Sequence, residues 1–357
     1  MRHLELFAGI GGFRMALTKL SEDFGIPQKT VAFSEIDKNA SASYKANYDT
    51  TGEQEMGDIV AFNSVPGNIR RLPDFDLLSG GFPCQSFSMM GKQLGFSDSR
   101  GNLFFEIMKI LHEKRPRFVL LENVRNLVNH DGGNTFKTIK AYLESEGYHV
   151  YHDVFDTQNF GLAQVRKRVY IFASLIDLGQ DFVYSAERIQ TVFEGVLEKT
   201  SLLKQRDTFD VLDKQVDEKY YLSERIKPTI LANGSKSYRA KSEINPLIAR
   251  PLTATMVKMH RACQDNYFSD EYISSTDHVK YLEKEYTKEE QSKKRIRKIT
   301  PWEALELQGF PREFYCNAEK AGISNHQLYK QAGNAVSVNT VYAILYYIFI
   351  HCHLLEE

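Results

Sequence analysis

The first 175 residues alternate between short β-prone runs and stretches in which apolar residues recur at helical spacing, and this pattern constrains the fold most strongly. Strands that alternate with helices predict βαβ units, and hence an α/β fold with a mostly parallel sheet and helices on both faces. Ligands of such sheets bind at the carboxyl ends of the strands. We expect strands at 3–7, 31–35, 75–79, 118–122, 149–155 and 169–174, and helices at 12–20, 37–47, 103–113 and 134–146.

The alternation stops near residue 176, where the chain becomes polar and rich in Lys, Glu, Ser and Tyr. We therefore expect a second, smaller domain. Thr300 followed by Pro301 predicts the start of a helix over 300–309, because Thr is a preferred N-cap and Pro is favoured at the first helical position. The expected organisation is a first domain of 1–175 that a C-terminal helix within 331–357 completes, a smaller domain at 176–295, and a hinge segment at 296–330.

Composition excludes several classes of protein. With 42% hydrophobic and 25% charged residues, the chain is neither disordered nor collagen-like. Its 45 Lys and Arg against 46 Asp and Glu give a net charge of −1, which neither favours nor excludes a nucleic-acid partner. The four cysteines are far apart, so we expect no disulfide framework, no structural zinc site and a reducing, cytoplasmic environment. The apolar run 341–350 is about half the roughly 20 residues of a membrane span, so we expect no membrane association.

Glycines and acids cluster where the first expected strands end. The turn Phe7-Ala-Gly-Ile-Gly-Gly12 follows the first strand and opens a helix, whose N-terminus offers free N–H groups to a ligand. Glu35 and Asp37 end the second strand, the place from which an acid commonly binds ribose hydroxyls. The segment Gly57-Asp58-Ile59 adds a third acid of this kind. A nucleoside-bearing cofactor is the favoured interpretation, and a plain strand–helix turn is the alternative.

Three further motifs carry reactive side chains. Cys84 directly follows Pro83 on a Gly-rich turn that leaves a strand, which is the placement of a nucleophile; the alternative is a small buried hydrophobe. Glu122 ends an apolar strand, where an unpaired acid is costly, and a structural salt bridge is the alternative. Arg166 and Arg168 are two residues apart and share one face if they lie on a strand, with solvated surface charge as the alternative.

Together these motifs resemble those of the C5-cytosine DNA methyltransferase family. The resemblance extends from residue 4 to about residue 341 and leaves out roughly 176–246 and part of 257–295. It implies the Rossmann-like fold of S-adenosylmethionine-dependent methyltransferases with a smaller target-recognition domain, and transfer of a methyl group to C5 of a cytosine in DNA. The matching segments are, in chain order, FAGIGGFR, SEID, GDI, GGFPCQSFS, RGNLFFEI, ENV, QNFGLAQVRKRVYI, RPLTAT and QAGNAVSVNTV.

The resemblance also implies the roles of the reactive side chains. Cys84 would add to C6 of the cytosine as a thiolate, because C5 alone is a poor nucleophile. Glu122 would hydrogen-bond N3 and the exocyclic amine of the ring. Arg168 would contact O2, and Arg166 would position neighbouring groups. No metal ion is expected in this chemistry.

The cofactor S-adenosylmethionine would leave as S-adenosylhomocysteine. By the resemblance, Glu35 would hold its ribose, Ile36 would pack on the adenine, and Asp58 would read the adenine amine. Ala335 stands where many relatives have Ser, so no hydroxyl contact is expected there. The remaining cofactor contacts would come from Phe7, Gly9, Ile10, Gly12, Ile59, Pro83, Leu103, Asn334 and Val336.

The target base is stacked inside a duplex and must be flipped into the pocket. A loop after the nucleophile, about 86–102, suits a lid that closes over double-stranded DNA. The segment 228–275 is expected to carry sequence specificity, since the segments around it match motifs needed for any target. The basic run 293–298 is a candidate for phosphate contacts, with a solvated face as the alternative. DNA contacts are expected from Gln85, Ser88, Met90, Lys92, Arg100, Arg239, Lys241 and Arg261.

Two other functions are alternatives at this point. A transfer-RNA cytosine-5 methyltransferase has the same fold, but its Cys-Phe-Thr signature is missing, and Gly80-Gly-Phe-Pro-Cys84 stands in place of its PPCQPFTR-like segment. A catalytically dead DNA-binding module is opposed by the intact set of reactive residues. The compact chain indicates a bacterial or phage modification enzyme. We expect it to act as a cytoplasmic monomer on DNA, alongside a companion restriction endonuclease.

Overall fold

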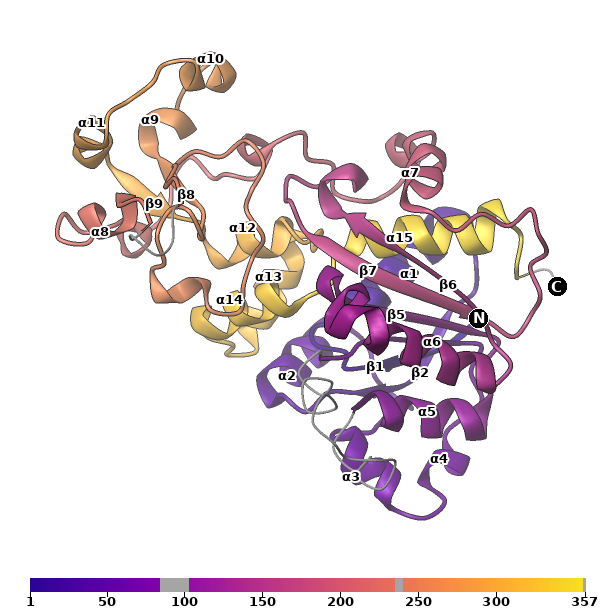
Figure 1. Ribbon diagram of the computed structural model, residues 1–357. Coiled ribbons are helices and arrows are strands. Elements are labelled where there is room, and N and C mark those ends of the chain that lie inside the picture. The colour runs from indigo at the N-terminus through magenta and orange to yellow at the C-terminus, as the bar shows by residue number, and fades with distance from the viewer. Residues whose placement is uncertain (84–102, 235–239, 356–357) are drawn as a thin grey trace. The chain divides into compact units, whose positions relative to one another are not determined.

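The computed structural model describes residues 1–83, 103–234 and 240–355 of the chain. The chain divides into two compact units, whose elements are labelled in Figure 1. Unit 1 consists of Met1–Asp156, Lys167–Leu202 and Val336–Glu357, and unit 2 of Thr157–Arg166 and Leu203–Ala335.

Unit 1 contains a seven-stranded sheet formed by β1 (Arg2–Leu6), β2 (Lys29–Ser34), β3 (Gln54–Glu55), β4 (Leu77–Gly81), β5 (Phe118–Val124), β6 (His149–Asp156) and β7 (Lys167–Ser174). Their order is β3-β2-β1-β4-β5-β7-β6. The pairs among β1 to β5 are parallel, whereas β7 is antiparallel to both of its neighbours. The connection from β6 to β7 is too short for the crossover helix that parallel neighbours need. The expected mostly parallel sheet is confirmed.

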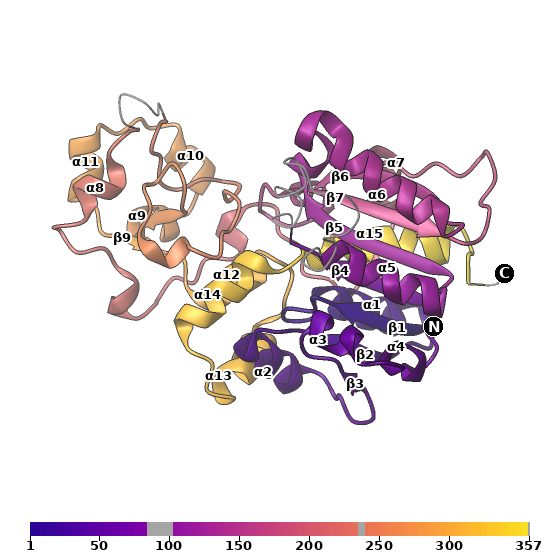
Figure 2. The same cartoon turned by 60° about the horizontal axis from the view of Figure 1, so that its bottom comes forward.

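Helices cover both faces of this sheet (Figure 2). On one face, α1 (Gly12–Phe24) lies against α15 (Val338–Tyr346), which also contacts α7 (Ala186–Glu194). On the other face, α5 (Leu103–Lys114) contacts α3 (Ile59–Ser64), α4 (Asn68–Arg71) and α6 (Asn134–Ser145). The helix α2 (Lys38–Asn47) follows β2.

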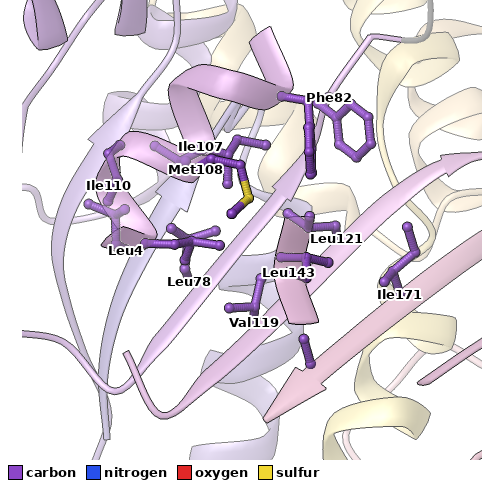
Figure 3. Packing of buried hydrophobic residues seen from close by; sticks show 14 of the residues in the cluster. Leu4, Leu78, Phe82, Ile107, Met108, Ile110, Val119, Leu121, Leu143 and Ile171 are labelled. Atoms are coloured by element: carbon purple, nitrogen blue, oxygen red, sulfur yellow. The ribbon is translucent and has the colours of Figure 1, made fainter. Parts of the chain in front are cut away.

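Alternate residues of the strands face the two helix layers. Leu4, Leu78, Val119 and Leu121 belong to one buried cluster with side chains of α5 and α6 (Figure 3). Phe118, which points to the opposite face, has its ring centroid 5.3 Å from that of Phe349 at the end of the C-terminal helical segment. This period of two is what strands buried on both faces require, and it fixes which residues reach the carboxyl edge of the sheet.

The boundaries of unit 1 differ from those of the expected first domain. Residues 176–202, which were assigned to the smaller domain, belong to unit 1 because they are anchored on α1 and α15. Lys19 donates to the Ser201 carbonyl oxygen at 3.0 Å, and Asp23 accepts from the Ser201 N–H at 3.1 Å. Phe193 of α7 packs on Tyr342 of α15, with ring centroids 6.1 Å apart.

Unit 2 contains a two-stranded antiparallel sheet of β8 (Tyr267–Ser269) and β9 (Ile296–Lys298). Its own apolar cluster includes Ile230, Tyr267 and Ile296. Residues 296–330, expected as a hinge, are packed in this unit. The helices of unit 2 are α8 (Lys227–Leu231), α9 (Asp270–Ile273), α10 (His278–Leu282), α11 (Lys288–Lys293), α12 (Pro301–Glu306), α13 (Arg312–Lys320) and α14 (Asn325–Asn334).

The N-terminus of α12 lies where the sequence predicts it. Thr300 is the N-cap, and its side chain and that of Glu303 form a capping box. Glu303 also pairs with Arg297, and both side chains are at most 1% exposed. The helix ends at Glu306, shorter than the expected 300–309.

By length and mean hydropathy, one helical segment of the described chain, Asn325–His351, would pass as a membrane span, but 89% of its apolar window is buried inside the protein. It comprises α14, α15 and a π-helical end, Tyr347–His351. Tyr342 of α15 donates to Asp23 of α1 at 2.7 Å. Core packing therefore accounts for the apolar character of this segment.

Candidate active site

The turn between β1 and α1 is held in a conformation that favours glycine. Phe7, Gly9 and Gly11 have φ angles of 51°, 55° and 81°. Tyr48, just after α2, donates its hydroxyl to the Gly11 carbonyl oxygen at 2.8 Å. A Cβ at Gly11 would lie 2.4 Å from the Tyr48 ring, so no larger residue fits. The turn is therefore fixed and leads into the N-terminus of a 13-residue helix, which begins at Gly12.

Glu35 joins this turn to the end of β2. One of its carboxylate oxygens accepts from the Gly9 N–H and the other from the Asp37 N–H, each at 2.7 Å. Each oxygen has a second lone pair, so Glu35 can hold the turn and still accept from a ligand hydroxyl. The neighbouring Ile36 is 72% exposed. An exposed apolar side chain beside a polar anchor suits a nucleoside.

The other predicted cofactor residues of unit 1 differ in exposure. Asp58 is the N-cap of α3, and its side chain accepts from the Val60 N–H at 2.9 Å. Pro83 is exposed, whereas Phe7 and Leu103 are half-buried. Ile10, Ile59 and Val336 lie in the core, where they are 2%, 3% and 9% exposed.

An acid and a guanidinium meet near the carboxyl end of β5. Arg168 Nε lies 3.0 Å from Glu122 Oε1, and the two side chains are 21% and 11% exposed. Glu122 is in register with Gly81 of β4. A Cβ at Gly81 would lie 3.2 Å from Glu122 Oε2, so glycine leaves room for the carboxylate.

Asn123, which sequence analysis did not single out, fixes the backbone that leads to Cys84. Its amide donates to the Phe82 carbonyl oxygen at 2.7 Å, and both residues are buried. Phe82 also packs against Phe104 of α5, with ring centroids 5.9 Å apart. The segment that leaves β4 is therefore anchored up to the residue before Pro83. The signal for Asn123 was its place in the ENV motif beside Glu122.

Arg166 lies before β7 begins, so it does not share a strand face with Arg168. It belongs to unit 2 and is 3% exposed. Its guanidinium donates to the carbonyl oxygens of Leu252, Gly333 and Ala335, at 3.2, 3.2 and 2.8 Å. These bonds join a loop to the end of α14, where the exposed Asn334 is the last helical residue. The arrangement agrees with a positioning role.

Two further residues of unit 2 hold the loop that contains Leu252 and Thr253, and sequence analysis missed both. The buried Gln164 accepts from the Leu252 N–H at 3.1 Å and donates to the Leu307 carbonyl oxygen at 2.9 Å. A Cβ at Gly333 would lie 2.2 Å from the Thr253 carbonyl carbon, so glycine is required there. Gln164 and Gly333 both stand inside the quoted motifs, which was the available signal.

The expected DNA contacts fall into two groups. Lys241 is exposed and pairs with Glu243, and Arg261 donates to the Asn233 carbonyl oxygen at 3.1 Å. Both side chains keep further N–H groups that could donate to DNA. The expected nucleophile and the other expected DNA contacts lie outside the described residues: Cys84, Gln85, Ser88, Met90, Lys92, Arg100 and Arg239.

Most cations of the basic run 293–298 have carboxylate partners, and the expectation of phosphate contacts from this run stays a prediction. Lys293 pairs with Glu289, and the nearly buried Lys294 pairs with Glu271. Arg295 and Arg297 likewise have carboxylate partners. Most of the run therefore serves the internal structure of unit 2.

The comparisons with known proteins agree with this geometry. The sequence matches the family model described as C-5 cytosine-specific DNA methylase over residues 1–349. The Type II methyltransferase M1.ScrFI of Lactococcus lactis subsp. cremoris is 38% identical over 341 residues, which cover 96% of this chain and 76% of that protein. The Type II methyltransferase M.HaeII of Haemophilus aegyptius is 37% identical over 345 residues, 96% of this chain and 90% of that protein.

A solved structure supports the predicted fold class. The structure of the Entamoeba histolytica methyltransferase EhMeth has a TM-score of 0.71 and 20% sequence identity, and the match covers 98% of both chains. The family match spans nearly the whole sequence, and close to its full length is shared with relatives above 30% identity. The chain therefore belongs to the C-5 cytosine-specific DNA methylase family and is a DNA (cytosine-5-)-methyltransferase.

Proposed function

We propose that this enzyme transfers a methyl group from S-adenosylmethionine to C5 of a cytosine flipped out of double-stranded DNA. The observation that carries the proposal is the ion pair of Glu122 with Arg168, 3.0 Å apart, beside the strand from which the chain runs to Cys84. The pairing edge of cytosine carries O2, N3 and the exocyclic amine, in that order. An acid next to a guanidinium matches that edge, because the acid can bond N3 and the amine while the arginine donates to O2.

The side chains divide the chemistry between them. Cys84 attacks C6 as a thiolate, which forms a C–S bond and raises the electron density at C5. Glu122 holds the proton at N3 as charge builds up on the ring, and Arg168 stabilises O2. S-adenosylmethionine, when bound, supplies the electrophilic methyl group. A base removes the C5 proton after methylation, the C–S bond breaks, and Cys84 leaves as a thiolate.

The residues of unit 1 fit this cofactor by their chemistry. Glu35 keeps acceptor capacity for ribose hydroxyls, and Ile36 offers an exposed apolar face for adenine. Asp58 has a carboxylate oxygen left for the adenine amine beyond its bond to Val60. The proposed reaction uses no metal ion, and the described residues contain no cluster of three or more His, Cys, Asp or Glu that could hold one.

Replacing Glu35 with alanine is expected to weaken affinity for S-adenosylhomocysteine by about 5- to 150-fold, since leaving a buried polar group without its hydrogen-bond partner costs about 1–3 kcal/mol. Calorimetric titration measures this change. Glu55→Ala is the control, because Glu55 is an exposed acid of β3 that pairs with Lys45. Glu35→Gln keeps one acceptor oxygen, so its affinity for S-adenosylhomocysteine is expected to lie between those of Glu35→Ala and Glu55→Ala. Unchanged affinity in Glu35→Ala would remove Glu35 from the cofactor site.

Replacing Cys84 with alanine is expected to abolish methylation, because in the proposed mechanism its thiolate forms the bond to C6. Bisulfite sequencing of a plasmid that expresses the enzyme should show 5-methylcytosine at one short recognition sequence for the wild type and none for Cys84→Ala. Duplex DNA with 5-fluorocytosine at that site should trap the wild type in a denaturation-resistant adduct. Cys316→Ala is the control, and transfer-RNA transcripts assayed in parallel test the RNA alternative. Methylation by Cys84→Ala at a comparable rate would refute the mechanism.

We further propose that unit 2 recognises the target sequence, with Lys241, Arg261 and the segment 228–275 as candidates. The loop 86–102, expected to act as a lid, lies outside the described residues. The Type II names of the relatives support a role in a cytoplasmic restriction–modification system, in which a companion endonuclease cuts unmodified DNA. One chain supplies both the acid and the arginine of the site, which supports a monomer as the active form.

A further inference from the structure

Unit 2 contains a small pocket beside the end of β9, with a cavity volume of about 20 Å³. The pocket lies wholly in described residues of one unit. Lys298, the last residue of β9, reaches it from the strand. Other walls of the pocket come from Pro251, Met256, Asp265, Asn266 and Tyr329.

Lys298 differs from the other cations of the run 293–298. Each of the others has a carboxylate within 4.0 Å, whereas Lys298 has none among the residues that the structure describes. Its side chain is half-buried, and burial lowers its pKa. Its Nζ lies 5.5 Å from the centroid of the Tyr329 ring, a contact that is weaker than an ion pair to a carboxylate.

The other polar side chains of the pocket already have partners. The Asn266 amide accepts from the Arg250 N–H and donates to the Arg250 carbonyl oxygen. Asp265 accepts from the His260 N–H and lies 3.4 Å from its ring Nδ1. The Tyr329 hydroxyl donates to a backbone carbonyl. The lysine ammonium is therefore the group of this pocket with hydrogen bonds left to donate.

We propose that Lys298 binds a phosphate group of the DNA backbone in this pocket. The proposal rests on the proposed function, because it takes duplex DNA as the substrate. A partly desolvated ammonium without an acid partner is costly, and a phosphate oxygen offsets that cost with a charge-assisted hydrogen bond. Such a contact positions the duplex on unit 2 without reading its sequence. It also explains why this one cation of the run is left without a carboxylate.

The test is the salt dependence of DNA binding. Lys298→Gln is expected to lower the magnitude of the slope of log K against log salt concentration by about 1. It should also weaken the binding of cognate and non-cognate duplexes alike. Lys298→Arg, which keeps the charge, should retain the slope of the wild type. Lys293→Gln is the matched control, because Lys293 belongs to the same run but is exposed and paired with Glu289. It should bind DNA as the wild type does.

A second measurement uses the unaltered enzyme and does not depend on the folding of a variant. An amine-reactive acetylating reagent, read out by mass spectrometry, should modify Lys298 in the free protein and much less in the complex with DNA, while Lys293 stays equally reactive. An unchanged slope in Lys298→Gln, or equal labelling of Lys298 with and without DNA, would overturn the proposal. A loss of affinity confined to the cognate duplex would also overturn the proposal, because such a loss would indicate that Lys298 contacts a base. A wild type that binds no DNA would instead count against the proposed function.

Discussion

Glu122→Gln is expected to reduce kcat for DNA methylation by about 10²–10⁴-fold, the usual contribution of a positioned general acid–base group. Glutamine keeps the shape of the side chain and can still form hydrogen bonds. It cannot carry or release the proton that N3 needs as Cys84 attacks C6. Single-turnover methylation of a cognate duplex at saturating S-adenosylmethionine measures the chemical step. Affinity for S-adenosylhomocysteine should stay unchanged, because the cofactor anchors are other side chains.

Glu106→Gln is the matched control for this variant. Glu106 is also a buried acid of unit 1, 2% exposed, and it pairs with Lys109 at 2.7 Å and accepts from the Asn63 amide at 2.9 Å. Glu106 lies on α5 and takes no part in the proposed chemistry, so the kcat of Glu106→Gln should match that of the wild type. Equal losses in both variants would indicate general destabilisation of unit 1. A fully active Glu122→Gln would refute the role of Glu122.

Arg297→Met is expected to lower the free energy of unfolding of unit 2 by about 3–5 kcal/mol, because it leaves a buried acid without its counter-charge. Arg297 donates to both carboxylate oxygens of Glu303, at 2.9 and 2.8 Å, and to the Asp213 carbonyl oxygen at 2.9 Å. Chemical denaturation measures the loss. The fluorescence of Trp302, the single tryptophan of the chain, reports on α12, where its indole N–H donates to Asp213 at 2.8 Å.

Arg295→Met is the control on the same segment. The Arg295 side chain is 54% exposed and pairs with Glu218 and Asp270 near the surface. Exposed pairs contribute little to stability because solvent screens them, so this variant should be nearly as stable as the wild type. The double variant Arg297→Met/Glu303→Gln should recover part of the loss, because a neutral amide replaces the orphaned charge. Equal stability of Arg297→Met and Arg295→Met would contradict the buried-pair argument.

Local patterns predicted the longer strands and most of the longer helices of unit 1, because these elements are long enough to show their period. The strand expected at 118–122 is β5 (Phe118–Val124), and the helix expected at 103–113 is α5 (Leu103–Lys114). The pattern missed β3, whose two residues are too short to show a period. It also did not predict the reversed direction of β7, since hydrophobic alternation is the same for either strand direction.

Short contiguous motifs in the sequence determined the family and the set of proposed reactive side chains. Each of these side chains stands within a few residues of the others in its own motif, as Cys84 does in GGFPCQSFS and Glu122 in ENV. Only the tertiary structure decided how those side chains are paired. The β5–β7 register places Arg168 beside Glu122, and Arg166 donates to carbonyl oxygens of unit 2. Lys298 has no carboxylate partner within the part of the chain that the structure describes. Ion pairs and buried hydrogen bonds depend on distances between residues that are far apart in the chain, and a local sequence pattern does not encode those distances.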